Sequence, residues 1–234
     1  MNRFSRIFSL CIAVLISLSA LADNRKQVKL TTDYGIIVVE LYNETPLHRD
    51  NFLRQVEAHT YDGVLFHRVI NNFMIQTGDP TSKTAQPGQM LGNGDENDKE
   101  SAWIPAEFCT PQLFHERGAL AAAREGDSVN PEKKSSSQQF YIVTGRTYGD
   151  KGLEKAQETI TEWTGGRVVL TEEMQEAYRT NGGAPHLDGS YTVFGRVLEG
   201  MDIVDKIQVE EVDSNNRPLN DIHIIKAEII TTEN

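Results

Sequence analysis

Short β-branched runs separated by turn residues fill much of the chain, and they limit its fold more than any other feature. Residues 28–32 and 36–41 are two such runs, and the Asp33-Tyr34-Gly35 turn between them is typical of a β-hairpin. No long helical pattern appears between residues 64 and 142, so the sequence predicts a mainly β domain. Comparable runs occur at residues 64–70, 73–77, 118–123 and 139–143, around a Gly/Asn/Asp-rich loop at residues 80–101.

Two modest helices and two further strands complete this pattern. Thr45 followed by Pro46 predicts the start of a helix that ends near His59. The tail predicts a strand at residues 191–197, a short helix around residues 201–207 and a last strand at residues 223–230. Many short strands with two helices favour a closed antiparallel β-barrel, because closure removes exposed sheet edges.

Residues 145–185 interrupt the strand pattern with a charged and mostly polar segment. Thr171 is a candidate N-cap, Met174 and Tyr178 share one helical face, and Gly182-Gly183 is a candidate stop. We therefore expect a partly helical insertion.

The first 22 residues have the pattern of a secretory signal peptide. Arg3 and Arg6 precede a mostly apolar run at residues 7–18, and Ala20-Leu21-Ala22 is a candidate cleavage site. A transmembrane anchor or a buried helix is the alternative, but the run is shorter than the roughly 20 residues of a membrane span. We expect cleavage after Ala22.

This reading predicts a periplasmic or secreted protein with no stable membrane insertion after cleavage. Lipoprotein anchoring through Cys11 is a minor alternative, because that cysteine lies inside the apolar run. The C-terminal Thr231-Thr232-Glu233-Asn234 is not an endoplasmic-reticulum retention signal.

The charge, cysteine content and length of the mature chain, residues 23–234, limit its partners, its disulfides and its number of domains. The formal net charge of −11 becomes −13 without Arg3 and Arg6, which argues against a nucleic-acid partner. Cys109 is left unpaired, so no intramolecular disulfide is expected and an inert thiol is its simplest interpretation. A chain of this length buries roughly 70% of its unfolded surface, which is enough for one domain.

Residues 66–79 (FHRVINNFMIQTGD) place a single arginine among apolar residues. Strand alternation puts Phe66, Arg68 and Ile70 on one face, so the guanidinium of Arg68 should face a pocket or the core. The plainer alternative is a snorkelling or ion-paired structural arginine.

This stretch closely resembles the signature of the cyclophilins. The likeness continues in register at residues 120–123 (LAAA), 137–142 (SQQFYI) and 187–195 (LDGSYTVFG), and it spans about residues 29–230 around the insertion. The resemblance implies an eight-stranded antiparallel barrel with a helix over each end. It also implies peptidyl-prolyl cis-trans isomerase activity, in a groove on the outside of the barrel.

The resemblance also implies roles for individual residues. Arg68 matches the catalytic arginine, and further positions match residues that bind substrate in the groove: Phe73, Met74, Gln76, Ala123, Gln139 and Leu187.

Four further substrate-binding positions depart from the common family residues. Tyr141 replaces a frequent phenylalanine, so its hydroxyl needs a partner. Arg124 replaces a frequent asparagine, which suggests a preference for acidic substrates. His186 and Tyr191 stand where the best-known eukaryotic members have tryptophan and histidine, so weakened sensitivity to the family's cyclic-peptide inhibitor is expected.

Other chemistry lacks its usual motifs. No GxSxG, HExxH, GxxxxGK or GxGxxG sequence is present, and we expect neither a cofactor nor a metal. His67 is expected to be a packed, hydrogen-bonded residue, since isomerisation requires no proton transfer.

Two functions remain: an isomerase acting on proline-containing polypeptides, or a non-catalytic chaperone module that binds proline peptides. The resemblance favours a monomer.

Overall fold

The computed structural model describes residues 25–95, 97–99 and 102–230. The predicted signal peptide and Cys11 lie outside this range. The described chain is mainly β, as predicted, with nine strands, four α-helices and short 3-10 turns. The strands are β1 (Gln27–Thr32), β2 (Gly35–Leu41), β3 (Val64–Leu65), β4 (Arg68–Ile70), β5 (Met74–Thr77), β6 (Ala119–Ala122), β7 (Phe140–Val143), β8 (Val193–Glu199) and β9 (His223–Ile230). The helices are α1 (Pro46–Glu57), α2 (Asp150–Thr164), α3 (Glu172–Thr180) and α4 (Met201–Gln208).

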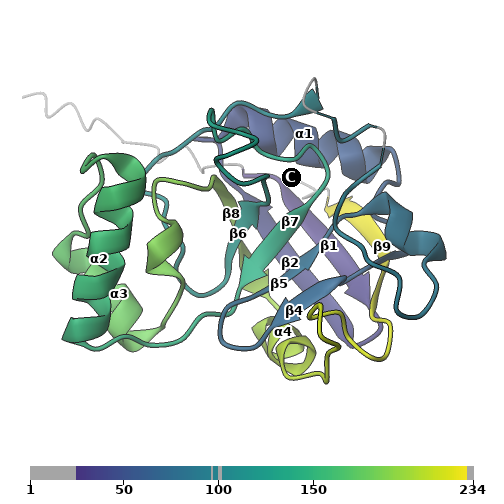
Figure 1. Ribbon diagram of the computed structural model, residues 1–234. Coiled ribbons are helices and arrows are strands. Elements are labelled where there is room, and N and C mark those ends of the chain that lie inside the picture. Colours follow the sequence, from purple (N-terminus) through teal and green to yellow (C-terminus); the bar gives the residue numbers. More distant parts are fainter. Residues whose placement is uncertain (1–24, 96, 100–101, 231–234) are drawn as a thin grey trace, which may run out of the picture.

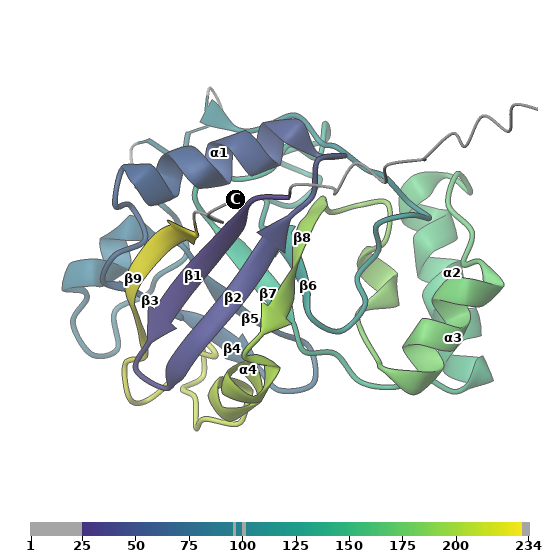
Figure 2. The same ribbon diagram turned by 180° about the vertical axis from the view of Figure 1, so that it is seen from behind.

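All nine strands form one curled antiparallel sheet in the order β3-β9-β1-β2-β8-β6-β7-β5-β4 (Figures 1 and 2). The two outermost strands, β3 and β4, are separated only by Phe66 and His67. One short stretch of chain therefore pairs with β9 at one end and with β5 at the other, which brings the sheet around into a barrel. The predicted count of eight differs because the run at 64–70 is broken into two strands.

This break also corrects the predicted alternation. Phe66 packs in the main core, whereas Ile70 packs against a second cluster on the outer side of the sheet. The irregular residues between β3 and β4 shift the side-chain alternation, so Phe66 and Arg68 do not share a face.

The two faces of the sheet bury different side chains. On neighbouring strands Ile75, Leu120 and Ile142 point into the main core, while Met74 and Tyr141 belong to the outer cluster. This period-2 alternation separates the packed barrel interior from an outer surface that can carry a binding site.

Helices α1 and α4 cover the two ends of the barrel, as predicted (Figure 1). Phe52 and Val56 of α1 and Val204 and Ile207 of α4 are buried in the main core. Pro46 stands at the start of α1, where a missing backbone N–H removes no helical hydrogen bond.

The insertion forms a separate helical layer beside the sheet (Figure 1, left). Thr171 caps α3 by accepting a hydrogen bond from the backbone N–H of Met174, as the sequence predicts. The insertion has a small core of its own, made of Leu153, Ala156, Ile160, Leu170, Met174 and Tyr178.

The chain enters and leaves the insertion through a tight neck of two glycines. A Cβ on Gly145 would lie 2.3 Å from the Cα of Gly183, and one on Gly183 would lie 2.6 Å from the Tyr178 ring. Both glycines have positive φ angles, of 61° and 153°. Only glycine allows so close an approach with this backbone, so the two ends of the insertion are held together here.

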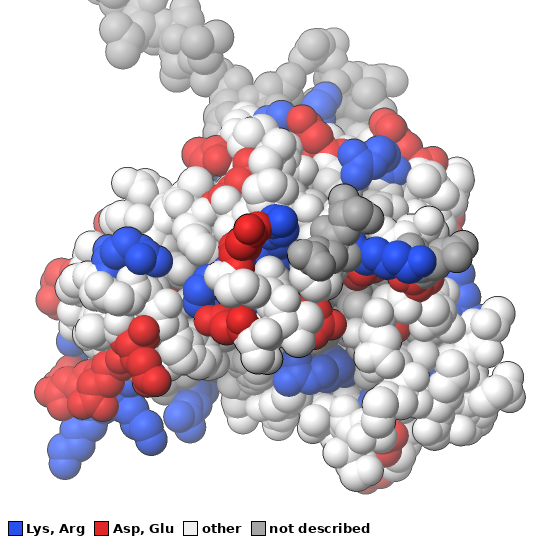
Figure 3. Space-filling view, turned by 45° about the horizontal axis from the view of Figure 1, so that its top comes forward, with Lys and Arg blue, Asp and Glu red and all other residues white. Residues whose placement is uncertain are grey.

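The surface carries mixed charge. On the face shown in Figure 3, acidic and basic side chains are interspersed, with a group of acids at the side where the insertion lies. Among the described residues, no helix is long and apolar enough to cross a membrane.

Candidate active site

A row of paired residues crosses four strands on the outer face of the sheet. Arg68 on β4 is the direct partner of Gln76 on β5, which pairs with Tyr141 on β7, which pairs with Ala121 on β6. Directly paired residues in an antiparallel sheet point to the same side. The sheet register therefore brings Arg68, Gln76 and Tyr141 together.

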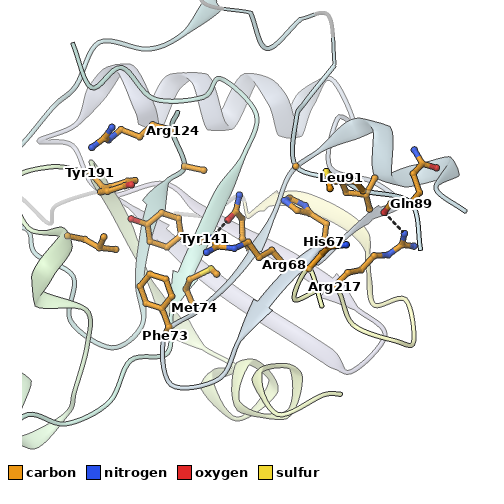
Figure 4. A pocket seen from close by; sticks show the side chains of 16 residues that line it. His67, Arg68, Phe73, Met74, Gln89, Leu91, Arg124, Tyr141, Tyr191 and Arg217 are labelled. Atoms are coloured by element: carbon orange, nitrogen blue, oxygen red, sulfur yellow. Dashed lines mark hydrogen bonds between the residues drawn. The ribbon is translucent and has the colours of Figure 1, made fainter. Parts of the chain in front are cut away.

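These residues line a pocket of about 310 Å³ that opens to solvent (Figure 4). Nine of the eleven predicted site residues line it: Arg68, Phe73, Met74, Gln76, Ala123, Arg124, Tyr141, Leu187 and Tyr191. The other two lie next to lining residues: Gln139 contacts Gln76, and His186 contacts Phe73.

Arg68 is held in place by a neutral side chain and keeps its positive charge. Its Nη1 donates to Oε1 of Gln76 at 3.0 Å, and within the described residues no carboxylate pairs with it. Partial burial lowers its pKa, yet a guanidinium stays protonated throughout the physiological range. The pocket thus contains a fixed cationic donor with unused N–H groups.

The Gln76 side chain connects Arg68 to a second amide. Nε2 of Gln76 donates to Oε1 of Gln139 at 3.1 Å, and Nε2 of Gln139 donates to the carbonyl of Gly92 at 3.0 Å. Gln139 therefore supports Gln76 from behind and also lines an adjoining depression of about 60 Å³. Its predicted role in binding substrate stays a prediction, because Gln139 lines this depression and not the main pocket.

The opposite wall is apolar. Met74, Tyr141 and Leu187 are buried in the outer cluster, and Phe73 packs against them. His186 packs against Phe73, with ring centroids 5.4 Å apart and the rings tilted by 35°, and supports that ring without lining the pocket. The Tyr141 hydroxyl points away from the pocket and meets Nε2 of His115 at 3.1 Å, so the partner that it requires is present.

Arg124 forms part of the wall and carries no free charge. It pairs with Asp127 at 2.7 Å and donates to the Ser190 carbonyl at 2.8 Å, while its guanidinium lies 4.3 Å from the centroid of Tyr191. The expected preference for acidic substrates therefore loses its physical basis, since the cation is balanced within the protein.

Seven lining residues were missed by the sequence reasoning: His67, Gln89, Met90, Leu91, Gly92, Asn215 and Arg217. Figure 4 shows His67, Gln89, Leu91 and Arg217 on the far side of Arg68 from Tyr141. Arg217 clamps the loop there by donating to the carbonyls of Gln86 and Gln89, at 2.9 and 3.1 Å, and pairing with Asp221. The loop at residues 80–101 has no periodicity that could have identified this wall.

His67 is packed, as predicted. The residue is 4% exposed, and its ring nitrogens approach the Leu65 backbone and the Gln139 side chain without a hydrogen bond of good geometry among the described residues. Burial is the largest influence on it and lowers its pKa to about 4. His67 is therefore neutral at physiological pH and adds no charge beside Arg68.

The described residues contain no group of three or more His, Cys, Asp or Glu side chains that could hold a metal ion. What they provide is a cationic donor beside an apolar wall, on the outer face of a curled β-barrel with helical caps. This combination suits a neutral peptide segment with a compact apolar ring.

Comparison with known proteins identifies the family. The sequence model of the family described as "Cyclophilin type peptidyl-prolyl cis-trans isomerase/CLD" matches residues 27–229. The chain belongs to this family, and it is a cyclophilin-type peptidyl-prolyl cis-trans isomerase.

Individual relatives agree with this assignment. A protein of Staphylococcus haemolyticus, provisionally named a peptidyl-prolyl cis-trans isomerase, is 30% identical over 88% of this chain and 92% of its own length. A similarly named protein of Staphylococcus epidermidis is 32% identical over 88% of this chain and 93% of its own length.

Solved structures confirm the fold. A cyclophilin-type isomerase of Cryptosporidium parvum superposes with a TM-score of 0.61 at 22% identity, over 89% of this chain and 99% of its own. A second structure of that protein, in the presence of the dipeptide Ala-Pro, gives a TM-score of 0.58 at 23% identity, over 88% of this chain and 99% of its own.

Proposed function

We propose that Arg68 accelerates X-Pro isomerisation by stabilising the twisted amide of a substrate whose proline ring occupies the apolar wall. The observation that carries this proposal is the position of Arg68. It is fixed by Gln76, unpaired by any described carboxylate, and directed into the same pocket as Tyr141 and Met74.

The chemistry follows from the amide bond. Rotation about an X-Pro bond disrupts amide resonance, with a barrier of roughly 18 to 20 kcal/mol. In the twisted state the prolyl nitrogen recovers a lone pair that can accept a hydrogen bond. A donor aimed at that nitrogen stabilises the twisted state more than either planar state, which is the condition for catalysis.

The pocket must also hold the ring while the acyl side turns. Phe73, Met74, Tyr141 and Leu187 provide apolar contacts for the ring. Shortening a process of about a hundred seconds to about a millisecond requires roughly 7 kcal/mol, at about 1.36 kcal/mol per decade. One charge-assisted hydrogen bond together with positioning is of the right size for that.

Proline-containing polypeptides are the proposed substrates. The presence of Ala-Pro with the structurally similar protein supports this class. A monomer is sufficient for the proposed activity, since every residue assigned to the pocket belongs to one chain, and size-exclusion chromatography tests this state.

The deciding experiment measures the cis-to-trans rate of a short X-Pro peptide at low temperature. Residues 23–234 should accelerate the reaction strongly, and Arg68→Ala should lower kcat/KM by about two decades or more. Arg167→Ala is the matched control, because Arg167 is an exposed arginine on the insertion, and it should leave the rate unchanged. An Arg68→Ala rate within a factor of about three of wild type would contradict the role of Arg68.

The alternative is a non-catalytic chaperone module. The adjoining depression and the insertion beside the groove offer additional contact surface for a polypeptide. This function predicts binding of proline peptides without acceleration by the wild-type chain, so the same assay separates the two.

We also propose that the substrates are exported proteins. The support is the signal-peptide pattern of residues 1–22. Expression of the full chain with N-terminal sequencing of the product tests this: a mature protein beginning at Asp23 in the periplasm or the medium is expected. An uncleaved chain retained in the cytoplasm would refute export.

A further inference from the structure

A chain of buried polar groups runs from the active site to the insertion. The Tyr141 hydroxyl contacts Nε2 of His115 at 3.1 Å, and Nδ1 of His115 contacts Oδ1 of Asp188 at 2.8 Å. The hydroxyl of Tyr178, on α3 of the insertion, donates to Oδ2 of Asp188 at 2.6 Å. These four residues are called the relay below.

The relay is fully enclosed. The side chains of His115 and Asp188 are 1% and 0% exposed, and Tyr141 and Tyr178 are buried as well. Burial raises the pKa of both tyrosines well above the ordinary value, so both hydroxyls keep their protons. Buried polar groups of this kind are costly unless every one of them is hydrogen-bonded.

The chemistry of the groups sets the direction of each hydrogen bond. An ionised carboxylate only accepts, so Asp188 accepts hydrogen bonds from Nδ1 of His115, from the backbone N–H of His115 at 2.8 Å and from the Tyr178 hydroxyl. With its proton on Nδ1, a neutral His115 has only a lone pair on Nε2, and Tyr141 must donate to it. Tyr178 is thus the far end of a continuous series of donors and acceptors.

The relay joins parts of the molecule that the sequence keeps apart. Tyr141 lines the pocket on β7, His115 lies just before β6, and Asp188 directly follows Leu187, another lining residue. Tyr178 is the largest member of the insertion core and packs against Phe114, with ring centroids 5.5 Å apart. The insertion is therefore connected to Tyr141 of the apolar wall by a continuous series of hydrogen bonds through Asp188 and His115.

We propose that Tyr178, Asp188 and His115 are positioning residues for the isomerase, and that through them the insertion holds the Tyr141 ring in place against the substrate proline. The relay keeps the Tyr141 hydroxyl turned away from the pocket, so that only the apolar ring faces it. Without Tyr178, Asp188 loses one of its three donors, and the orientation of His115 and of the Tyr141 ring loosens. This inference rests on the proposed proline pocket.

A double-mutant cycle in the peptide isomerisation assay tests the relay. Tyr178→Phe keeps the packed ring but removes the donor, and it should lower kcat/KM about five- to tenfold, since small misplacements near the reacting centre have large effects. In a Tyr141→Phe background the same change should lower kcat/KM less than about twofold, because there is no hydroxyl left for the relay to orient.

Tyr148→Phe is the matched control. Tyr148 packs against Tyr178 with ring centroids 6.3 Å apart, but it contributes no hydroxyl to the relay, so its kcat/KM should stay at the wild-type value. If Tyr178→Phe lowers kcat/KM by the same factor in both backgrounds, Tyr178 contributes only to general stability. That result would overturn the proposal. No fall in either background would also overturn it.

A second measurement needs no variant. The ring nitrogen shifts of His115 by 15N NMR should show a proton on Nδ1 and none on Nε2, and the opposite tautomer would contradict the relay. Failure of the pocket itself is distinguishable, because then the wild-type chain would not accelerate isomerisation at all. An active wild type without coupling between positions 141 and 178 would refute the relay alone.

Discussion

Lowering the pH from about 7.5 to about 5 is expected to remove about 2 kcal/mol of folding stability through His67 alone. His67 lies next to Arg68 and lines the active-site pocket, with its imidazole enclosed by the protein. Burial lowers its pKa from the ordinary value of 6.5 to about 4. The charged groups that face it oppose each other, since Asp79 favours protonation and Arg68 disfavours it.

The sign follows from proton counting. Between pH 4 and pH 6.5 the unfolded chain carries a proton on this histidine and the folded protein does not. Stability therefore rises with pH across this window, and it falls as the pH is lowered through it. The full difference of about 2.5 pH units corresponds to roughly 3 kcal/mol at about 1.36 kcal/mol per unit, and about 2 kcal/mol of this is lost by about pH 5.

Urea unfolding at the two pH values measures the effect. With an m-value of about 2 kcal/mol/M, the unfolding midpoint should fall by about 1 M through His67. A His67→Gln variant corrects for all other titrating groups, since glutamine does not ionise. Its unfolding midpoint should fall by about 1 M less than that of the wild-type protein. Equal pH dependence in the two proteins, or an NMR titration of His67 near its ordinary pKa, would refute the reasoning.

Two further substitutions test the site and the core. Gln76→Leu removes the acceptor that holds Arg68 and the donor to Gln139. It should lower kcat/KM by about tenfold to a hundredfold in the peptide assay. An unchanged rate would show that Arg68 needs no support from Gln76. Phe52→Ala should reduce the free energy of unfolding, measured by urea unfolding, by about 3 to 5 kcal/mol. The reason is that Phe52 is 2% exposed and packs on Tyr61, Phe140 and Phe194. A loss below about 1 kcal/mol would contradict its place in the core.

Much of the fold could be predicted because strand and helix patterns are local. The β1–β2 hairpin, the two capping helices and the helical insertion with Thr171 at its N-cap all agree with the sequence patterns. The broken strand at residues 64–70 was missed, because alternation assumes a regular strand and nothing in this run signals the shift at Phe66 and His67. The same error placed Phe66 beside Arg68.

Much of the pocket could be predicted from the resemblance, since matched motifs carry the family's residues in order. Arg68, Gln76 and Tyr141 lie on three strands, β4, β5 and β7, and meet in one pocket. The wall formed by residues 89–92, Asn215 and Arg217 could not be predicted, because loops without periodicity are placed only by the contacts they make in three dimensions.

By itself, the amino-acid sequence determined where most strands and helices lie along the chain and the single arginine in the signature stretch. The tertiary structure alone decided how individual charges and hydroxyls are used. Asp127 neutralises Arg124, and burial keeps His67 neutral. Hydrogen bonds through His115 and Asp188 connect Tyr141 to Tyr178 of the insertion. The physical reason is that propensity and periodicity act between neighbours in the chain. Hydrogen bonding and desolvation depend on groups that folding brings together, such as His115 and Asp188, which are 73 positions apart.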